Sequence, residues 1–90
     1  MHAVDLLEEA IRTALALGYT LRQEWLGGVD GGDCEIKGRK YLFLDLSLSV
    51  HERLRLVLDV LHRENATRRV AVSETLRRVL EASLPSDKAA

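Results

Sequence analysis

The chain has 90 residues, 47% hydrophobic and 30% charged, with a formal net charge of −1 and a pI of about 6.3. This length and composition predict one globular domain and exclude an intrinsically disordered chain. The near-zero net charge excludes a global electrostatic attraction to nucleic acid or membrane. The single cysteine, Cys34, excludes a disulfide within the chain, and no run approaches the ~20 apolar residues of a membrane span. Because the first residues also lack the basic start of a signal peptide, we expect a cytoplasmic protein.

Charge is distributed unevenly along the chain. Residues 1–36 carry seven acids against two arginines, a formal charge of −5, whereas residues 37–78 carry ten bases against five acids, a formal charge of +5. We expect the two signs to pair within the fold, or head to tail between subunits.

The first predicted element is a helix over residues 3–17, where apolar side chains recur at helical spacing. Its expected apolar face comprises Val4, Leu7, Ile11, Ala14 and Leu15. Gly18 then supplies a left-handed stop.

Three strands follow. Residues 19–26 alternate with period two, with Tyr19 and Trp25 on the more apolar face. Residues 33–37 form a short strand that places Cys34 and Ile36 on one face. Residues 40–48 form the strongest strand, with leucines on one face and Tyr41 and Phe43 on the other, which is typical of a central strand.

Two helices complete the chain. Residues 49–65 begin with Ser49 and Glu52 at capping-box spacing, and residues 74–84 begin after Ser73 and end at Pro85. The predicted order is therefore α-β-β-β-α-α. We expect a two-layer α+β domain over residues 1–84, with a three-stranded antiparallel sheet and its helices on one face, and a disordered tail over residues 85–90.

The glycine-rich segment 27–32, GGVDGG, does not predict a phosphate site. A phosphate-binding loop continues into Lys-Ser or Lys-Thr and a helix, whereas this segment continues into Asp33 and a strand. Its acids also lack the spacing of an EF-hand calcium loop. We interpret it as a flexible strand connection, and the alternative is a functional loop that closes on a small partner or peptide.

No catalytic or metal-binding pattern is recognisable, and no cofactor is indicated. His51 and His62 are ~16 Å apart along one helix, too far for a single metal ion, and are interpreted as solvated helix residues. Cys34 is interpreted as a small buried hydrophobic residue, with a reactive thiol as the alternative. No serine lies in a nucleophile elbow. An enzyme is therefore not predicted.

The leading prediction is a non-enzymatic protein-interaction or dimerisation module. The strand and helix faces hold more apolar side chains than so small a domain readily buries, so we expect a second subunit or another protein to cover some of them. Trp25, Tyr41 and Phe43 are the candidate interface residues, because aromatic side chains dominate such surfaces. For Trp25 the alternative is ordinary packing within the sheet.

The alternative prediction is nucleic-acid binding. Five arginines gather near the C-terminus and could meet phosphates, although no aromatic residue is interleaved for base stacking: Arg63, Arg68, Arg69, Arg77 and Arg78. Residues 41–84 also resemble the ribbon-helix-helix DNA-binding proteins in the order strand, helix, connection, helix. That resemblance implies a dimer whose paired strands enter the major groove, with either Tyr41, Phe43 and Asp45 or Leu42, Leu44 and Leu46 facing the bases.

Overall fold

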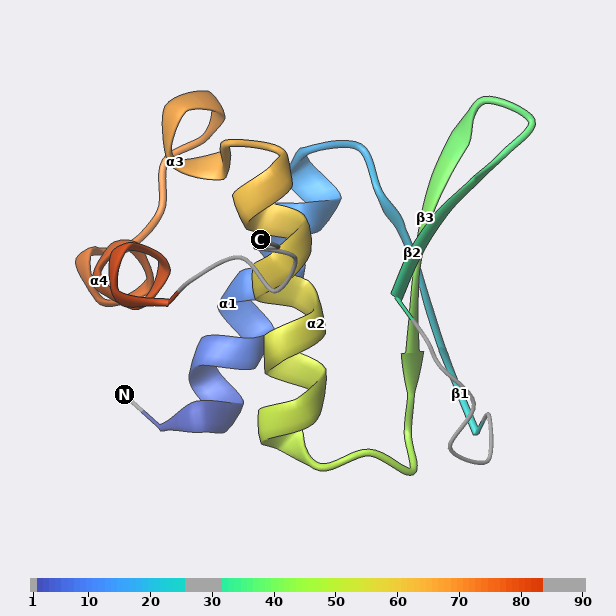
Figure 1. Ribbon diagram of the computed structural model, residues 1–90, viewed down its shortest axis with the longest axis horizontal. Coiled ribbons are helices and arrows are strands. Elements are labelled where there is room, and N and C mark those ends of the chain that lie inside the picture. The colour runs from blue at the N-terminus through green and yellow to red at the C-terminus, as the bar shows by residue number, and fades with distance from the viewer. Residues whose placement is uncertain (1, 26–31, 84–90) are drawn as a thin grey trace, which may run out of the picture.

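The computed structural model describes residues 2–25 and 32–83, which form four helices and three strands. In chain order these are α1 (Ala3–Ala16), β1 (Thr20–Glu24), β2 (Gly32–Ile36), β3 (Arg39–Asp45), α2 (Val50–Arg63), α3 (Ala66–Arg69) and α4 (Glu74–Ala82). The predicted α+β class is confirmed, and α3 is one short helix more than expected (Figure 1). Residues 27–31, which were predicted to form a strand connection, and residues 85–90, which were predicted to form a tail, lie outside the described residues.

The sheet is mixed rather than antiparallel, which corrects the prediction. Its strand order is β1-β3-β2, with β1 parallel and β2 antiparallel to β3. Short connections predicted that β1 and β2 would pair as neighbours, but β3 lies between them. The reason is burial, because a central strand is covered along both edges and β3 is the most apolar of the three.

The central position predicted for the third strand is confirmed. Leu42 and Leu44 are fully buried against the helices, and Tyr41 and Phe43 on the opposite face are half-buried. The strand ends at Asp45, which is fully buried. Its Oδ1 accepts hydrogen bonds from the backbone N–H and the hydroxyl of Ser47, which offset the cost of burying the carboxyl group. This turn directs the chain from the sheet into α2.

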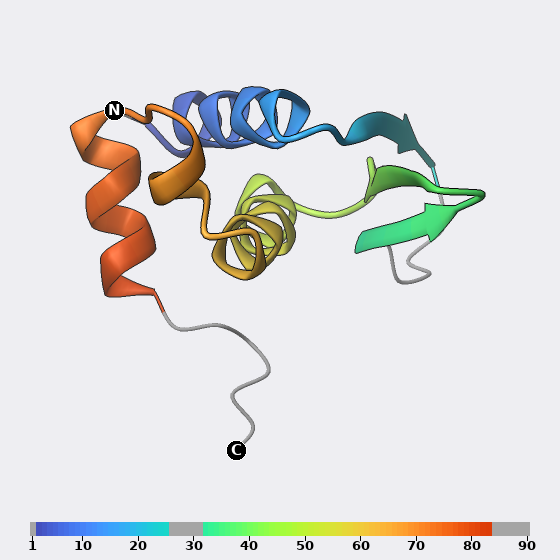
Figure 2. The ribbon, with the colours of Figure 1, turned by 90° about the horizontal axis from the view of Figure 1, so that it is seen from above.

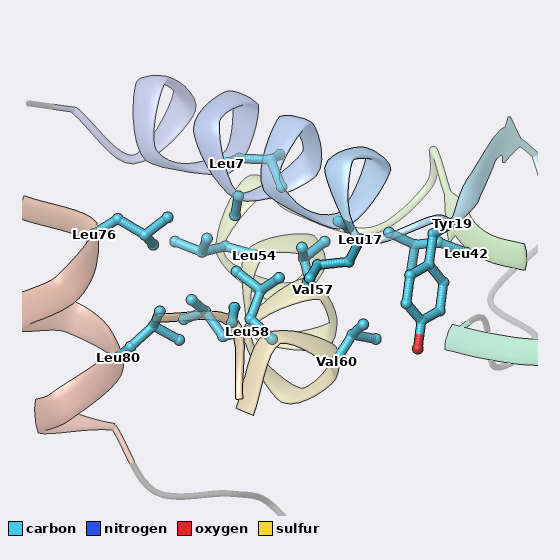
Figure 3. Packing of buried hydrophobic residues seen from close by; sticks show 14 of the residues in the cluster. Leu7, Leu17, Tyr19, Leu42, Leu54, Val57, Leu58, Val60, Leu76 and Leu80 are labelled. Atoms are coloured by element: carbon cyan, nitrogen blue, oxygen red, sulfur yellow. The ribbon is translucent and has the colours of Figure 1, made fainter. Parts of the chain in front are cut away.

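The helices do not all lie against the sheet. In Figure 1, α1 and α2 pack side by side next to the sheet, and α4 packs against this helix pair on the side away from the sheet. Figure 3 shows the resulting core running from Leu76 and Leu80 of α4, through α1 and α2, to Tyr19 and Leu42. The predicted two-layer arrangement therefore has α4 as an additional layer.

The buried face of α1 differs from the prediction. Its buried residues are Leu6, Leu7, Ala10, Thr13 and Ala14. Leu7 and Ala14 belong to the predicted face, whereas Val4 and Leu15 remain 50% and 44% exposed. Apolar residues occupy about half of the circumference of this helix, wider than the side that packs on α2, so helical spacing alone did not select that side. The buried residues of α2 are Leu54, Val57, Leu58, Val60 and Leu61, which recur at helical spacing.

Local capping sets the ends of the later helices. Ser49 and Glu52 form the expected capping box at the start of α2, and Asn65, in the left-handed conformation at φ 54°, follows its end. The Ser73 hydroxyl caps α4 by accepting from the Leu76 N–H. Ser73 also donates from its backbone N–H and its hydroxyl to the Glu9 carboxylate of α1, at 2.8 and 2.6 Å, which attaches the start of α4 to α1.

Candidate interaction surface

One face of the sheet is not covered by α1 or α2. The strand register places Cys34 and Thr20 opposite Tyr41, and Arg22 opposite Phe43, so these side chains share the face that points away from the helices. The other face carries Leu42 and Leu44, which are buried beneath the helices. We define the open face by six of the residues on this side: Thr20, Arg22, Cys34, Ile36, Tyr41 and Phe43.

The centre of the open face is apolar and aromatic. Tyr41 and Phe43 are stacked with ring centroids 5.9 Å apart at an interplanar angle of 27°. Ile36 is 48% exposed next to them. The predicted burial of Cys34 is wrong, because β2 is an edge strand and its Cys34 side lies on the uncovered face.

Trp25 lies beyond the end of β1 and is 75% exposed. The structure therefore brings Tyr41 and Phe43 together and places Trp25 separately, past the end of the neighbouring strand. Ordinary sheet packing does not account for so exposed an indole. Ile36 was not among the candidate interface residues, although its alternation with Cys34 on a short strand was the signal that could have identified it.

A polar cluster joins the helix side of the sheet to the end of α2. The Glu64 carboxylate accepts from the Tyr19 hydroxyl at 2.7 Å and from Lys40 Nζ at 3.1 Å, and it also pairs with Arg69 of α3. The Lys40 ammonium lies 5.6 Å from the centroid of the Tyr19 ring. Next to this cluster, Arg63 forms an ion pair with Asp33 of β2. Glu64 was not among the residues predicted to be functional, because nothing local to it in the sequence indicates partners in the sheet.

These contacts shift the protonation equilibria of the cluster. Burial, with the hydrogen bond to Glu64, raises the pKa of Tyr19 to about 12. Hydrogen bonds from Tyr19 and Lys40 lower the pKa of Glu64 below its ordinary value. Although burial opposes it, the Asp33 carboxylate raises the pKa of Arg63. The cluster therefore holds Glu64 ionised and Tyr19 neutral near neutral pH, which suits a structural contact between sheet and helix.

The five arginines of the predicted basic cluster do not gather on one element. Arg63 points to β2, Arg68 and Arg69 lie on α3, and Arg77 and Arg78 lie on α4, across the α1–α2 pair from the sheet. Four of them pair with acids of this chain: Arg63 with Asp33, Arg69 with Glu64, and Arg77 and Arg78 with Glu74. Arg68 is exposed. Much of the positive charge of the second half is thus matched within the fold.

The ribbon-helix-helix resemblance implies that the strand preceding α2 pairs with the same strand of a second copy. In this fold that strand is β3, which has β1 on one edge and β2 on the other. Both hydrogen-bonding edges of β3 are occupied within one chain, so the implied pairing is not available to it.

A groove of about 490 Å³ lies between α2 and the end of α4. At its edge His62 Nε2 and Ser83 Oγ are 2.9 Å apart, within hydrogen-bonding distance. Asp59 and His51 also line the groove, from α2. The residues described contain no group of three or more His, Cys, Asp or Glu side chains that could hold a metal ion. The His62 contact joins two helices, and we assign the groove no reaction.

Comparisons with protein-family models, with curated proteins and with solved structures give no significant match to this chain. Across the described part of the chain, no helix is both long and apolar enough to cross a membrane.

Proposed function

We propose that this protein is a non-enzymatic contact module that binds another protein chain through the open face of its sheet. The observation that carries the proposal is the stacked, half-exposed pair of Tyr41 and Phe43 beside the exposed side chains of Ile36 and Cys34. Contiguous apolar surface of this kind marks interaction sites in small domains, and aromatic side chains contribute most of the binding energy there.

The surroundings of this pair support the same proposal. Arg22 and Glu24 form an exposed ion pair at 2.8 Å along β1, and Arg39 is exposed at the start of β3. An apolar centre with a charged rim is the usual anatomy of a protein–protein interface. The rim excludes water from the centre and restricts the orientation of the partner.

Replacing Phe43 with threonine tests the open face. Threonine retains a strong strand preference, so the sheet should form, whereas the aromatic contact is lost. We expect protein partners captured from an extract of the native cell by the immobilised wild-type chain to bind the variant at least tenfold more weakly. The readout is identification and quantification of the retained proteins by mass spectrometry.

Glu35→Thr is the matched control, since Glu35 is exposed on the neighbouring strand but lies on the helix side of the sheet. It should retain the same proteins as the wild type. Equal retention of those proteins by a folded Phe43→Thr variant would contradict the proposal.

The alternative function, a DNA-binding regulator that uses residues 41–84, has weaker support. The arginines that would meet phosphates are mostly paired with acids. We therefore expect a labelled random duplex to show no change in anisotropy when titrated with this protein, even at low salt. Binding that weakens steeply as salt rises would instead show that the arginines release phosphate counterions, and would favour the alternative.

A further inference from the structure

The outer edge of β1 is available for pairing with another strand. β1 has β3 on one side, and no other described strand lies along its second side. Figure 2 shows β1 at the margin of the sheet, on the side of α1. A strand with one unpaired edge presents a row of backbone donors and acceptors that can pair with a further strand.

Exposed apolar residues also lie on α1 and directly after β1. Of the four large hydrophobic side chains that are most exposed in the described residues, Val4 and Leu15 lie on α1 and Trp25 follows β1. At 3.6 residues per turn, Val4 and Leu15 lie within about 20° of each other around α1. They lie about 120–140° from Glu9, which holds the start of α4, so this stripe faces away from α4. Trp25 thus adds an exposed apolar side chain directly after the end of β1.

The charges along β1 favour pairing with a second copy of the same strand. In an antiparallel pair centred on Gln23, Arg22 of each copy lies opposite Glu24 of the other, which gives two ion pairs of opposite sign. By the alternation of extended chains, the same register places Leu21 opposite Trp25. A register centred on Arg22 would instead place two arginines together. Charge and apolar complementarity therefore select one register.

The edge of β2 does not offer this complementarity. Self-pairing centred on Cys34 would place Asp33 opposite Glu35, and self-pairing centred on Glu35 would place two glutamates together. Like charges directly opposite each other are destabilising in sheets. The acids of β2 protect that edge against self-association, whereas β1 carries no such pattern.

We propose that β1 pairs antiparallel with β1 of a second copy about a two-fold axis at Gln23, which yields a homodimer with a continuous six-stranded sheet in the order β2-β3-β1-β1-β3-β2. The axis is perpendicular to the sheet, so the open faces of the two copies lie on the same side. The dimer deepens the proposed function, because it presents two Tyr41–Phe43 pairs on one surface, but its formation does not depend on a partner binding there.

Charge reversal tests the pairing. Arg22→Glu places glutamate opposite Glu24 of the second copy, and Glu24→Arg places arginine opposite Arg22. We expect each variant to raise the dimer dissociation constant at least about tenfold in sedimentation equilibrium, since two attractive pairs become repulsive. An equimolar mixture of the two variants should recover the dimer, because glutamates at 22 and 24 of one copy then face arginines at 24 and 22 of the other.

The mixture also separates this contact from the Arg22–Glu24 ion pair within one chain. Both variants lose that internal pair, and mixing them cannot restore it, so recovery reports contact between copies. Arg39→Glu is the control, a reversal of an exposed arginine away from the β1 edge, and it should dimerise as the wild type does. Trp25, the only tryptophan, gives a second readout, because its fluorescence should shift to the blue as the wild-type dimer forms.

Three results would overturn the pairing. Wild type that remains monomeric at every concentration would exclude the dimer, and dimers of unchanged affinity in both reversal variants would exclude this edge. Failure of the mixture to recover the dimer would exclude this register. A wild-type dimer lost in Phe43→Thr but kept in the reversal variants would assign the self-contact to the open face, leaving the proposed function in place and removing the β1 pairing.

Discussion

Replacing Glu64 with glutamine should lower the free energy of unfolding by about 2 kcal/mol at neutral pH, because charge-assisted hydrogen bonds are about twice as strong as neutral ones. The Glu64 carboxylate accepts from Tyr19 and Lys40 and pairs with Arg69, and its side chain is 15% exposed. Glutamine preserves the size of the side chain but removes the negative charge that pairs with Lys40 and Arg69. The measurement is urea unfolding followed by circular dichroism.

The effect of this substitution should depend on pH in a defined direction. The folded protein lowers the pKa of Glu64 from its ordinary value of 4.5, so the stability it contributes is full above that value. That contribution is lost as the pH falls through the lower folded-state pKa. The difference in unfolding free energy between wild type and Glu64→Gln should therefore shrink on acidification below about pH 4.5.

The alkaline side offers an independent measurement. The folded protein raises the pKa of Tyr19 to about 12 from 10.0, so the stability linked to its neutral phenol is full below 10.0 and is lost as the pH rises toward 12. In Glu64→Gln the tyrosinate absorbance of Tyr19 should appear at lower pH, since the carboxylate is gone while burial remains. A Tyr41→Phe background isolates the signal of Tyr19.

Glu81→Gln is the control for this series, because Glu81 is exposed on α4, away from the cluster. It should change neither the unfolding free energy at neutral pH nor the titration of Tyr19. A Glu64→Gln variant that matched this control in both measurements would show that the cluster does not join the sheet to α2.

Replacing Leu44 with alanine should lower the free energy of unfolding by about 3 kcal/mol, the largest effect we expect from a single substitution. Leu44 is fully buried on the central strand, beneath the helices, so truncation removes apolar contacts and leaves a cavity. Because β3 is hydrogen-bonded to a neighbouring strand on each edge, it cannot shift to fill that cavity. Urea unfolding again measures the change.

Leu46→Ala is the matched control, the same truncation just past the end of β3, where the side chain is half-buried. It should destabilise the protein by about 1 kcal/mol, in proportion to the smaller apolar area lost. Equal losses at the two positions would mean that β3 is not the strand on which the core is built.

The elements themselves follow from local sequence. The period-two pattern around Leu42 and Leu44 predicted the central strand, and the Ser49 capping box predicted the start of α2. These signals are local because a strand or helix with a buried side must repeat apolar residues at its own period, and because a cap is formed by residues three apart.

Tertiary structure decided how the elements combine. No local pattern distinguishes β1 paired with β2 from β1 paired with β3, and the choice follows from which strand the helices bury. The packing partner of α1 likewise selected Leu6 and Ala10 over Val4 and Leu15. Short-range spacing contains no information on a partner forty residues away.

For the candidate surface, too, some features follow from the sequence and others only from the fold. Sequence by itself identified Tyr41 and Phe43, because alternation alone places them on the face opposite the leucines. Only the fold exposed Cys34 and Ile36 beside them, gave Glu64 its partners in the sheet and separated Arg63 from Arg77. The physical reason is that side chains distant in sequence meet only when strand order and helix packing are set, and these depend on burial summed over the whole chain.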